Sequence, residues 1–354
     1  MTILGIETSC DETSLCLLQI DEHGKNNLRY KVLAHSTNSQ IELHKEFGGV
    51  YPALAKREHI KNLPILFEKI INDTKLKIEN IDLIAVTEGP GLEPALWTGI
   101  VFAKELSAKC NIPIIPINHM EGHIVSSLLK NSNTNDDFIE LKEIKFPSLS
   151  LLISGGHTEL IKIIELGKYK ILGETRDDAI GEAFDKVARM LNLSYPGGPK
   201  ISELANFARE KNLPKTFSLP RPMINSKDLD FSFAGLKTSI LYLLKDKNDI
   251  SEEFKQELCR EFEDSVTEVL IEKTKKALDT ESYNSLIIGG GVIANENIRN
   301  AFINIANEYN IELYIPVSGL TGDNALMIAL AGSLRYKQYK DREIKAKGNM
   351  RLDE

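Results

Sequence analysis

The sequence predicts an α/β protein built from two copies of one plan, and two observations support this class. Apolar strands alternate with amphipathic helices between residues 53 and 117, as expected for a sheet whose faces are covered by helices. A strand–turn–strand pattern occupies residues 3–20 and recurs at 149–164, about 150 residues later. This repeat indicates an internal duplication, although two unrelated hairpins would produce the same pattern.

The spacing of apolar residues predicts the elements of the first half in chain order. Two strands flank a polar turn at 7–12, and two strand–helix units follow them. The polar segment 131–137 is expected to form a surface loop. The predicted strands lie at 3–6, 13–20, 81–86 and 112–117, and the predicted helices at 53–72 and 96–110.

The second half repeats the hairpin and then becomes mainly helical. A turn is expected at 196–199 and a long loop at 211–230, where prolines are scattered and periodicity is weak. Gly322-Asp323-Asn324 opens the last predicted helix. The other predicted strands lie at 149–153, 158–164, 285–288 and 313–316, and the other helices at 179–193, at 258–278 and from Asn295.

These elements divide the chain into two lobes and a tail. Residues 1–117 are expected to form an N-terminal α/β lobe, completed by the last helix at 325–340. Residues 118–324 are expected to form a C-terminal α/β lobe with a helical insertion, and 341–354 a basic tail. Two domains suit a length of 354 residues.

Composition excludes several classes of protein. The chain is 42% hydrophobic, and no apolar run reaches the ~18 residues needed to cross a bilayer, so no membrane association is expected. The four cysteines form no CxxC pair, which favours reduced thiols over a zinc ribbon or a disulfide framework. No basic region precedes the first apolar residues, so we expect no signal peptide and predict a cytoplasmic protein.

The net charge of −8 argues against nonspecific nucleic-acid binding, which needs clustered Lys and Arg. Residues 335–351 are the exception, with seven basic and two acidic side chains. Composition alone favours a solvated, frayed helix there. Contact with RNA or with a partner protein is the alternative.

Two histidines four residues apart, His119 and His123, form the most informative local pattern. In a helix this spacing puts both imidazoles on one face, where they can bind one metal ion. Two hydrogen-bonded imidazoles would show the same spacing, so a third ligand is needed. Asp323, between Gly322 and Asn324 at a strand-to-helix junction, is the best candidate. Such a set leaves coordination positions open for substrate or water.

Three glycine-rich turns, at 88–91, 154–157 and 289–291, each follow an apolar strand and suggest phosphate binding. The adjacent glycines at 155 and 156 permit close approach and positive φ, so that successive N–H groups converge on phosphate. The third turn opens a helix, whose N-terminus favours anions. Each turn also has a structural explanation as a tight connection that needs glycine.

The polar turn at 8–13 offers N–H groups and hydroxyls to an anion. Its carboxylates, Asp11 and Glu12, are suited to positioning a metal-bound or attacking water. Thr, Ser and Asp also make ordinary turns through side-chain-to-backbone hydrogen bonds, and the turn by itself favours that explanation.

Taken together, these residues resemble the TsaD family of tRNA adenosine threonylcarbamoyltransferases. The matching segments follow the family's order from the first strand to about Gly332, so the resemblance covers nearly the whole chain. They are 5–13, 44–59, 89–92, 119–123, 154–158, 178–186, 195–199, 231–238, 289–295 and 322–324.

The resemblance implies a fold and a reaction. The fold is that of the actin and sugar-kinase (ASKHA) superfamily, two duplicated α/β lobes with a nucleotide in the cleft. The reaction moves the threonylcarbamoyl group of threonylcarbamoyl-AMP, made by a separate synthase, to N6 of adenosine 37 in tRNAs that read codons beginning with A. AMP leaves, and the product is threonylcarbamoyladenosine (t6A).

The resemblance also implies residue roles. His119, His123 and Asp323 would bind one divalent metal ion, Fe²⁺ in the first place or else Zn²⁺. Ser9, Asp11 and Glu12 would support catalysis beside the metal. The adenylate would be held by Leu152, Ile153, Ser154, Gly155, Gly156, Asp185, Gly198 and Asn295, with phosphate at 154–156 and the sugar and base near Asp185 and Asn295.

Family members of bacterial type act with a smaller inactive paralogue, TsaB, and a small ATPase, TsaE. The resemblance therefore implies TsaB-like and TsaE-like partners besides tRNA and threonylcarbamoyl-AMP. The acidic composition suits this arrangement, because a chain with little basic surface would gain an RNA-binding surface by assembly.

Three other functions remain open. A metalloprotease would use His119, His123 and a glutamate base, but the sequence HMEGH is not HExxH. A small-molecule kinase of the ASKHA fold would need a base for its hydroxyl substrate and no histidine pair. A noncatalytic scaffold in a tRNA-modifying assembly would need none of the three ligands. Loss of metal and of tRNA modification in His119→Ala would favour the transferase.

Overall fold

The computed structural model describes residues 1–23, 27–130, 138–245, 247, 250–339 and 342–354. The chain forms two compact units, residues 1–144 with 316–354 (unit 1) and residues 145–315 (unit 2). This division differs from the expected lobe boundaries at 117/118 and 324/325. The physical reason is that the segment after 118 contributes Val125 and Leu129 to the same apolar core as the last helix. The predicted loop at 131–137 lies outside the described residues.

In unit 1 a six-stranded sheet has the order β5-β4-β1-β2-β3-β6. β1, β4 and β5 are parallel, whereas β1, β2, β3 and β6 pair antiparallel in that order. The carboxyl ends of β1, β4 and β5 therefore meet at one edge of the sheet. The strands are β1 (Thr2–Glu7), β2 (Glu12–His23), β3 (Asn27–Ser39), β4 (Leu83–Gly89), β5 (Ile114–Asn118) and β6 (Phe138–Glu140).

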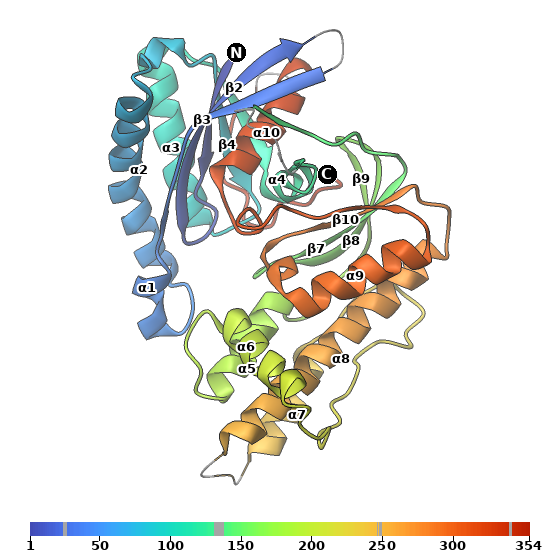
Figure 1. Cartoon of the computed structure of the whole chain (residues 1–354). Helices are drawn as coiled ribbons and strands as arrows, with labels where there is room; N and C mark the ends of the chain where they lie inside the picture. Colours follow the sequence, from blue (N-terminus) through green and yellow to red (C-terminus); the bar gives the residue numbers. More distant parts are fainter. Residues whose placement is uncertain (24–26, 131–137, 246, 248–249, 340–341) are drawn as a thin grey trace. The chain divides into compact units, whose positions relative to one another are not determined.

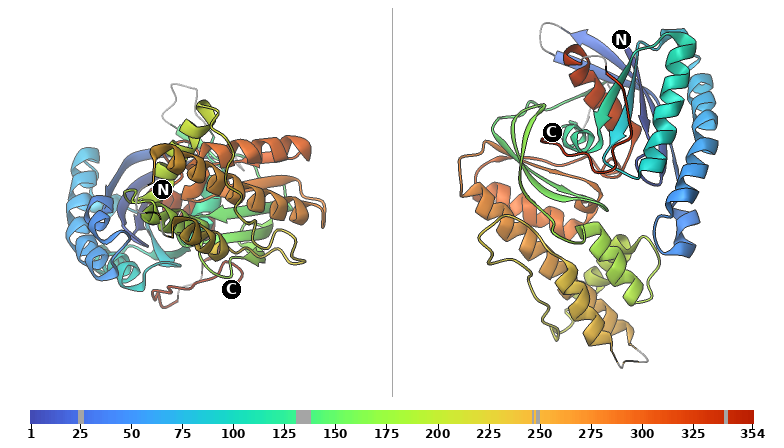
Figure 2. Two further views of the ribbon diagram at one scale, coloured as in Figure 1. Left: turned by 90° about the horizontal axis from the view of Figure 1, so that it is seen from below. Right: turned by 180° about the vertical axis from the view of Figure 1, so that it is seen from behind.

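Helices cover both faces of this sheet (Figure 1). Because side chains alternate along β1, Leu4 packs into the core shared with α2 and α3, while Ile3 packs into the core shared with α10. Figure 2 shows α2 and α3 side by side on one face. The helices are α1 (Ile41–His44), α2 (Pro52–Thr74), α3 (Glu93–Cys110), α4 (His119–Ser126) and α10 (Ala325–Arg335), with 3-10 turns η1 (Lys45–Phe47), η2 (Ile78–Asn80) and η4 (Tyr336–Gln338).

Unit 2 repeats the strand plan of unit 1. Its five-stranded sheet has the order β11-β10-β7-β8-β9, with β7, β10 and β11 parallel and β7, β8 and β9 antiparallel. This order reproduces β5-β4-β1-β2-β3 strand for strand, so the predicted duplication is confirmed. The strands are β7 (Ser148–Ile153), β8 (Thr158–Glu165), β9 (Lys168–Glu174), β10 (Ser285–Gly289) and β11 (Glu312–Tyr314).

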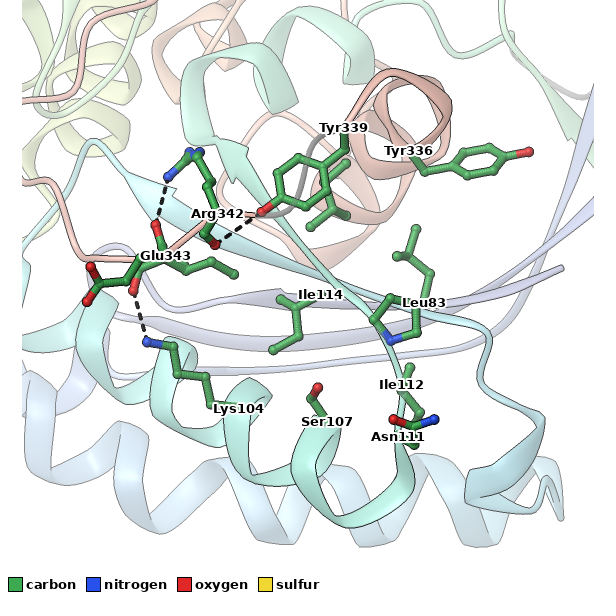
Figure 3. Close-up of a pocket in the computed structure, with 13 residues that line it drawn as sticks. Leu83, Lys104, Ser107, Asn111, Ile112, Ile114, Tyr336, Tyr339, Arg342 and Glu343 are labelled. Atoms are coloured by element: carbon green, nitrogen blue, oxygen red, sulfur yellow. Dashed lines mark hydrogen bonds between the residues drawn. The ribbon is translucent and has the colours of Figure 1, made fainter.

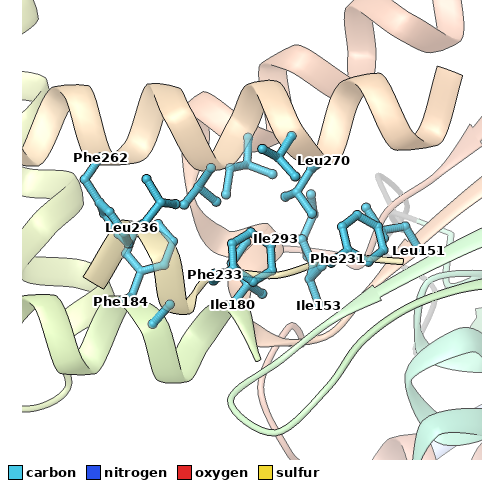
Figure 4. Packing of buried hydrophobic residues seen from close by; sticks show 14 of the residues in the cluster. Leu151, Ile153, Ile180, Phe184, Phe231, Phe233, Leu236, Phe262, Leu270 and Ile293 are labelled. Carbon is cyan, nitrogen blue, oxygen red and sulfur yellow. The ribbon is translucent and has the colours of Figure 1, made fainter. Parts of the chain in front are cut away.

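The helices of unit 2 pack against its sheet in one apolar core (Figure 4). Phe184 of α5 meets Phe262 of α8 edge to face, with ring centroids 5.0 Å apart. Phe231 and Phe233, after the long loop, stack in the same core. The helices are α5 (Ile180–Met190), α6 (Gly197–Glu210), α7 (Ala234–Leu244), α8 (Glu252–Leu278) and α9 (Glu296–Glu308), with the 3-10 turn η3 (Gly291–Ala294).

Most predicted elements are confirmed, and the differences have local causes. The long loop at 211–230 contains no helix or strand, as expected. The turn predicted at 196–199 is instead the first turn of α6, because Gly197 N–H is held by Asp185 Oδ1 at 2.7 Å. β3 and β9 were not predicted, since their mixed polar sequences lack an apolar run.

The C-terminal segment is the largest departure from expectation. The last helix ends at Arg335 rather than at residue 340, and the described residues after 341 form no helix. Instead, Ile344 and Leu352 are buried, and Ile344 joins the core of unit 1. The expected solvated, frayed helix is therefore wrong, because apolar side chains and backbone hydrogen bonds dock this segment.

None of the helices in the described part of the chain combines the length and apolar character needed to cross a lipid bilayer.

Candidate active site

The predicted histidine pair lies on a short, well-capped helix in unit 1. Asn118 ends β5 and caps α4, because its Oδ1 accepts hydrogen bonds from the N–H groups of Met120 (2.9 Å) and Glu121 (3.4 Å). His119 is thus the first residue of the helix and His123 follows one turn later. Both imidazoles are buried, and their ring centroids lie 4.8 Å apart.

Asp323 reaches the same point from the start of another helix. It precedes Asn324, whose Oδ1 caps α10 by accepting from Met327 N–H at 3.0 Å. Asp323 Oδ1 lies 3.3 Å from His119 Nε2 and 3.1 Å from His123 Nε2. The structure therefore brings together the three residues that the sequence suggested as metal ligands.

The donor set and geometry of these three residues fit a metal ion. One ligand atom from each of them lies within 4.8 Å of the other two. His123 Nε2 is buried and hydrogen-bonds to nothing among the described residues, although it faces Asp323. A buried nitrogen without a hydrogen-bond partner, aimed at a neighbouring carboxylate, is expected where both groups bind a cation.

Glu7 completes this cluster and was not predicted as a site residue. Its side chain is fully buried at the end of β1. Oε2 lies 3.1 Å from His119 Nδ1 and accepts from Thr87 Oγ1 at 2.6 Å, while Oε1 accepts from Ser9 N–H at 2.5 Å. In sequence Glu7 directly follows the apolar strand predicted at 3–6, and that position was the available signal. Its contact with Nδ1 leaves Nε2 of His119 facing Asp323.

The electrostatics of the cluster also favour a cation. Burial alone would lower the pKa of His119, but the carboxylates of Asp323 and Glu7 outweigh burial and raise it well above its ordinary value. Burial would raise the pKa of Asp323, yet His119 and His123 hold it well below its usual range. Positive charge is thus stabilised between two carboxylates, and a metal ion would take the place of the proton.

The turn between β1 and β2 carries the other predicted residues of unit 1. His59 of α2 holds both ends of the loop, since its Nε2 lies 2.9 Å from Cys10 O and its Nδ1 lies 2.8 Å from Thr13 Oγ1. Burial and the carboxylates of Asp11 and Asp323 raise the pKa of Glu12 to about 9. The raised pKa favours the protonated form of Glu12.

Ser9 lies in the same loop and is almost fully buried. Its N–H donates to Glu7 and its carbonyl accepts from Leu92 N–H at 2.8 Å. Its hydroxyl has no hydrogen-bond partner among the described residues. The backbone of Ser9 is therefore fixed while its Oγ remains available to a ligand.

Unit 2 contains a pocket of about 350 Å³ where β7, β10, α5 and α6 come together. Such a volume is within the range of small-molecule sites. Its walls combine apolar surface with a few polar groups. The lining includes four predicted residues, Gly155, Asp185, Gly198 and Asn295, together with Phe184, Pro196, Ser202, Asn206 and Val292.

The remaining predicted residues of unit 2 do not line this pocket. Leu152 and Ile153 are buried in β7, and Ser154 Oγ accepts from His157 N–H within the hairpin turn. Gly155 and Gly156 do not adopt positive φ, so that part of the phosphate argument is wrong. Both glycines nevertheless have open space where a side chain would stand, which leaves their backbone accessible.

One wall of the pocket is held by Glu263, a buried residue of α8 that was not predicted. Asn295 Nδ2 donates to Glu263 Oε1 at 2.5 Å and to Ser202 Oγ at 2.6 Å, and Ser202 Oγ donates to Glu263 Oε1 at 2.9 Å. Arg209 forms an ion pair with the same carboxylate. Asn295 Oδ1 also caps α9 through Ile298 N–H. This network fixes two pocket-lining side chains.

Comparison with known proteins identifies the family. A family model described as "TsaD: tRNA N6-adenosine threonylcarbamoyltransferase" matches residues 31–330. The chain belongs to this family. Proteins of the same name from Thermosipho melanesiensis (42% identity, 99% of this chain and 100% of the relative) and Nitrosomonas europaea (41%, 97% and 95%) resemble it over nearly their full lengths. A relative from Francisella tularensis subsp. mediasiatica is 44% identical over 95% of this chain and 94% of its own.

Solved structures support the fold assignment at low sequence identity. Component A of (R)-2-hydroxyglutaryl-CoA dehydratase from Acidaminococcus fermentans is similar with a TM-score of 0.50 and 15% identity, over 96% of this chain and 98% of that chain. HypF of T. kodakarensis is similar with a TM-score of 0.54 and 13% identity, over 95% of this chain and 48% of that chain. The likeness to both structures supports the predicted fold, two α/β units that share one five-strand plan.

Proposed function

We propose that this chain transfers the threonylcarbamoyl group of threonylcarbamoyl-AMP to N6 of adenosine 37 in tRNAs that read codons beginning with A. The bond between N6 and the carbamoyl carbon forms, the bond from that carbon to the phosphate oxygen breaks, AMP leaves with the bonding electron pair, and N6 releases one proton to the solvent. The observation that carries the proposal is the His119/His123/Asp323 cluster, with both imidazoles buried, in a chain of this family that also has a nucleoside-sized pocket.

The pocket of unit 2 suits the adenosine part of the donor. Phe184 and Val292 offer apolar surface to a base, while Asp185 and Asn295 offer polar groups to the sugar. The open backbone at Gly155 and Gly156 suits the phosphate. Leu152 and Ile153 were predicted to hold the adenylate. We assign them to shaping the end of β7 rather than to direct contact with the donor.

His119, His123 and Asp323 would hold one divalent ion, Fe²⁺ in the first place and Zn²⁺ as the alternative. When bound, such an ion polarises a carbonyl and stabilises negative charge that develops on it. Glu7 keeps His119 oriented for this role. Two imidazoles and a carboxylate suit either metal, so the ligand set is compatible with both Fe²⁺ and Zn²⁺.

The turn between β1 and β2 would assist the transfer. Glu12 is protonated at neutral pH and can donate a hydrogen bond to negative charge that develops on the donor. Ser9 offers an unengaged buried hydroxyl. Asp11 completes the polar surface of this loop and lies beside Glu12. We assign catalytic support to these three residues.

We further propose that the chain works in the cytoplasm with tRNA, a TsaB-like paralogue and a TsaE-like ATPase. All four described cysteines are free thiols, which suits a reducing compartment. The acidic net charge of −8 supports the need for partners that add RNA-binding surface.

A metalloprotease is the less favoured alternative. The glutamate of HMEGH, Glu121, lies 3.7 Å from Arg335, and its backbone N–H is engaged by the Asn118 cap. A metalloprotease would need another base, lying next to the metal ion, to activate water. A kinase of this fold would leave the histidine cluster without a role.

Reconstitution tests the proposal. The protein is mixed with unmodified tRNA, threonine, bicarbonate, ATP, a threonylcarbamoyl-AMP synthase and the two partners, and the digested nucleosides are analysed by mass spectrometry. We expect t6A that depends on this chain, and a loss of about 100-fold or more in Asp323→Ala, because one ligand of the metal is removed. The exposed carboxylate variant Asp73→Ala should retain full activity. Absence of t6A despite a confirmed supply of the adenylate would contradict the proposal.

A further inference from the structure

Two features of the sequence have no role in the proposed reaction, and the structure shows that they contact each other. The turn 88–91 follows β4, and the C-terminal segment runs over it. Lys347 N–H donates to Glu88 O at 2.9 Å, and Gly91 N–H donates to Gly348 O at 3.0 Å. A Cβ on Gly89 would lie 2.0 Å from Lys347 O. Glycine at 89 therefore serves the close approach of the C-terminal segment and not of a phosphate.

An ion pair fixes the same segment to the end of β4. Arg342 donates from Nη1 to Glu88 Oε1 at 2.7 Å and from Nη2 to Glu88 Oε2 at 2.5 Å. The Glu88 side chain is fully buried, so its charge depends on this partner. Lys345 N–H adds a weaker contact to Oε1 at 3.3 Å. Through Arg342, the segment thus supplies the positive charge that balances the buried Glu88 carboxylate at the end of β4.

Figure 3 shows this part of the segment beside a cavity of about 720 Å³. Lys104 of α3 donates to Ile344 O at 2.9 Å, and Tyr339 Oη lies 3.5 Å from Arg342 O. With Ile344 buried in the core, the segment is anchored by apolar packing as well as by polar contacts.

Beyond Gly348 the segment reaches the end of β5. Arg351 O accepts from Asn118 Nδ2 at 3.2 Å. Asn118 uses its other side-chain atom, Oδ1, to cap α4, whose first residue is the metal-ligand candidate His119. The C-terminal segment and the helix that carries both histidines therefore hold the Asn118 amide in place together.

The turn 88–91 links the segment to the acidic loop in the same way. A Cβ on Gly91, which has φ of +154°, would lie 2.7 Å from Ser9 O, and the adjacent Leu92 N–H donates to that oxygen. Gly91 N–H in turn donates to Gly348 O. One segment thus supports the start of α4 directly and, through the turn 88–91, the acidic loop after β1.

We propose that residues 342–352 form a strap that positions the metal centre by holding Asn118 and the turn 88–91. This inference rests on the metal site of the proposed function. The strap acts through backbone hydrogen bonds, the Arg342–Glu88 ion pair and the Asn118 amide, and these contacts include none of His119, His123 and Asp323, so it is a positioning element. Its loss should loosen the start of α4 and weaken metal binding without removing a ligand.

The test uses Gly89→Ala in the full-length protein, because the added methyl would lie 2.0 Å from Lys347 O and 3.1 Å from Met350 Cβ, both in the strap. The double variant Glu88→Gln/Arg342→Gln removes the ion pair without leaving a buried charge, and it carries the test if Gly89→Ala does not fold. Lys345→Ala is the matched control, since that exposed side chain forms its ion pair with the exposed Glu343 within the strap.

Two readouts are measured, Co²⁺ affinity by titration of its visible absorption and hydrogen exchange of the amides of α4 in metal-free protein. We expect about tenfold weaker Co²⁺ binding and faster exchange at Met120 and Glu121 in the strap variants, with the control unchanged. Wild-type Co²⁺ affinity together with wild-type exchange in a folded strap variant would overturn the inference. If the wild-type protein binds no Co²⁺, the metal proposal fails. Hydrogen exchange then still tests whether the strap holds α4: faster exchange in the strap variants supports this role, and unchanged exchange contradicts it.

Discussion

The two units use the same strand plan but differ in what they place at the ends of the strands. In unit 1 the ends of β1 and β5 and the start of α10 bring together ionisable groups, of which Glu7, His119 and His123 are buried and Asp323 is partly buried. In unit 2 the equivalent strand ends border a largely apolar pocket, and one buried carboxylate, Glu263, holds two of its polar groups, Ser202 and Asn295. A duplicated scaffold thus keeps its backbone while the residues at its strand ends change the chemistry.

A backbone feature that both units share, a glycine that packs against the first hairpin, makes this difference possible. After β4, Gly91 packs against Ser9 in the turn that follows β1. After β10, Gly290 has φ of +94° and a Cβ there would lie 2.3 Å from Ile153 O, at the end of β7. In both units a glycine after the neighbouring parallel strand permits close contact with the first hairpin. The fold therefore sets the positions, and side chains decide between a candidate metal centre and a candidate ligand pocket.

The comparison predicts the largest effect, among single changes that spare the ligands, for Glu7→Gln. Removing the charge weakens the hold on His119 Nδ1, so we expect metal affinity to fall about 10- to 100-fold. Co²⁺ titration measures it, and AMP binding to unit 2 serves as the internal reference and should not change. The exposed Glu79→Gln is the matched control. Metal affinity equal to that of wild type would show that Glu7 has no positioning role.

The corresponding change in unit 2 is Glu263→Gln. It keeps the shape of the side chain but removes the charge that holds Arg209, Ser202 and Asn295. We expect AMP to bind about tenfold more weakly by calorimetry, since a network holding two pocket-lining groups is loosened. Co²⁺ affinity should be unchanged, and Glu252→Gln at the exposed start of α8 should leave both values unchanged. Loss of Co²⁺ binding in Glu263→Gln would contradict the separation of the two sites.

The sequence predicted the parts of each site that repeat a local pattern. His119 and His123 were found because a spacing of four residues has meaning within one helix. The duplication was found because both hairpins are contiguous in the chain. Asp323 was selected by residue type, and only the packing of α10 beside α4 brings it within 3.3 Å of the histidines.

Residues that act through distant partners were missed. Glu263 lies in a long amphipathic helix, where a charged residue usually faces solvent, and only the fold turns it toward Asn295. The C-terminal segment was misjudged because its basic composition suggested exposure. Its docking depends on Glu88 and Gly89, which lie more than 250 residues earlier in the chain. A local sequence pattern contains no information about contacts between residues so far apart in the chain.

The smallest expected effect concerns pH and the acidic loop of unit 1. Burial, Asp11 and Asp323 raise the pKa of Glu12 from 4.5 to about 9, so between these pH values the folded chain keeps a proton that the unfolded chain has lost. Its contribution to stability is therefore fully present below pH 4.5 and is lost as pH rises toward 9. Gln at position 12 stays neutral throughout, so Glu12→Gln should unfold at a higher denaturant concentration at pH 8 and show a flatter pH profile.

Denaturant midpoints of metal-free protein from pH 5 to pH 9 measure this difference. The comparison with wild type isolates Glu12, because His119 and Asp323 titrate in both proteins. Glu46→Gln changes the net charge equally at an exposed position and should track wild type. Parallel profiles of Glu12→Gln and wild type would show that Glu12 ionises normally. The turn of unit 1 would then be as inert to pH as the hairpin turn of unit 2, which contains no carboxylate between Ser154 and His157.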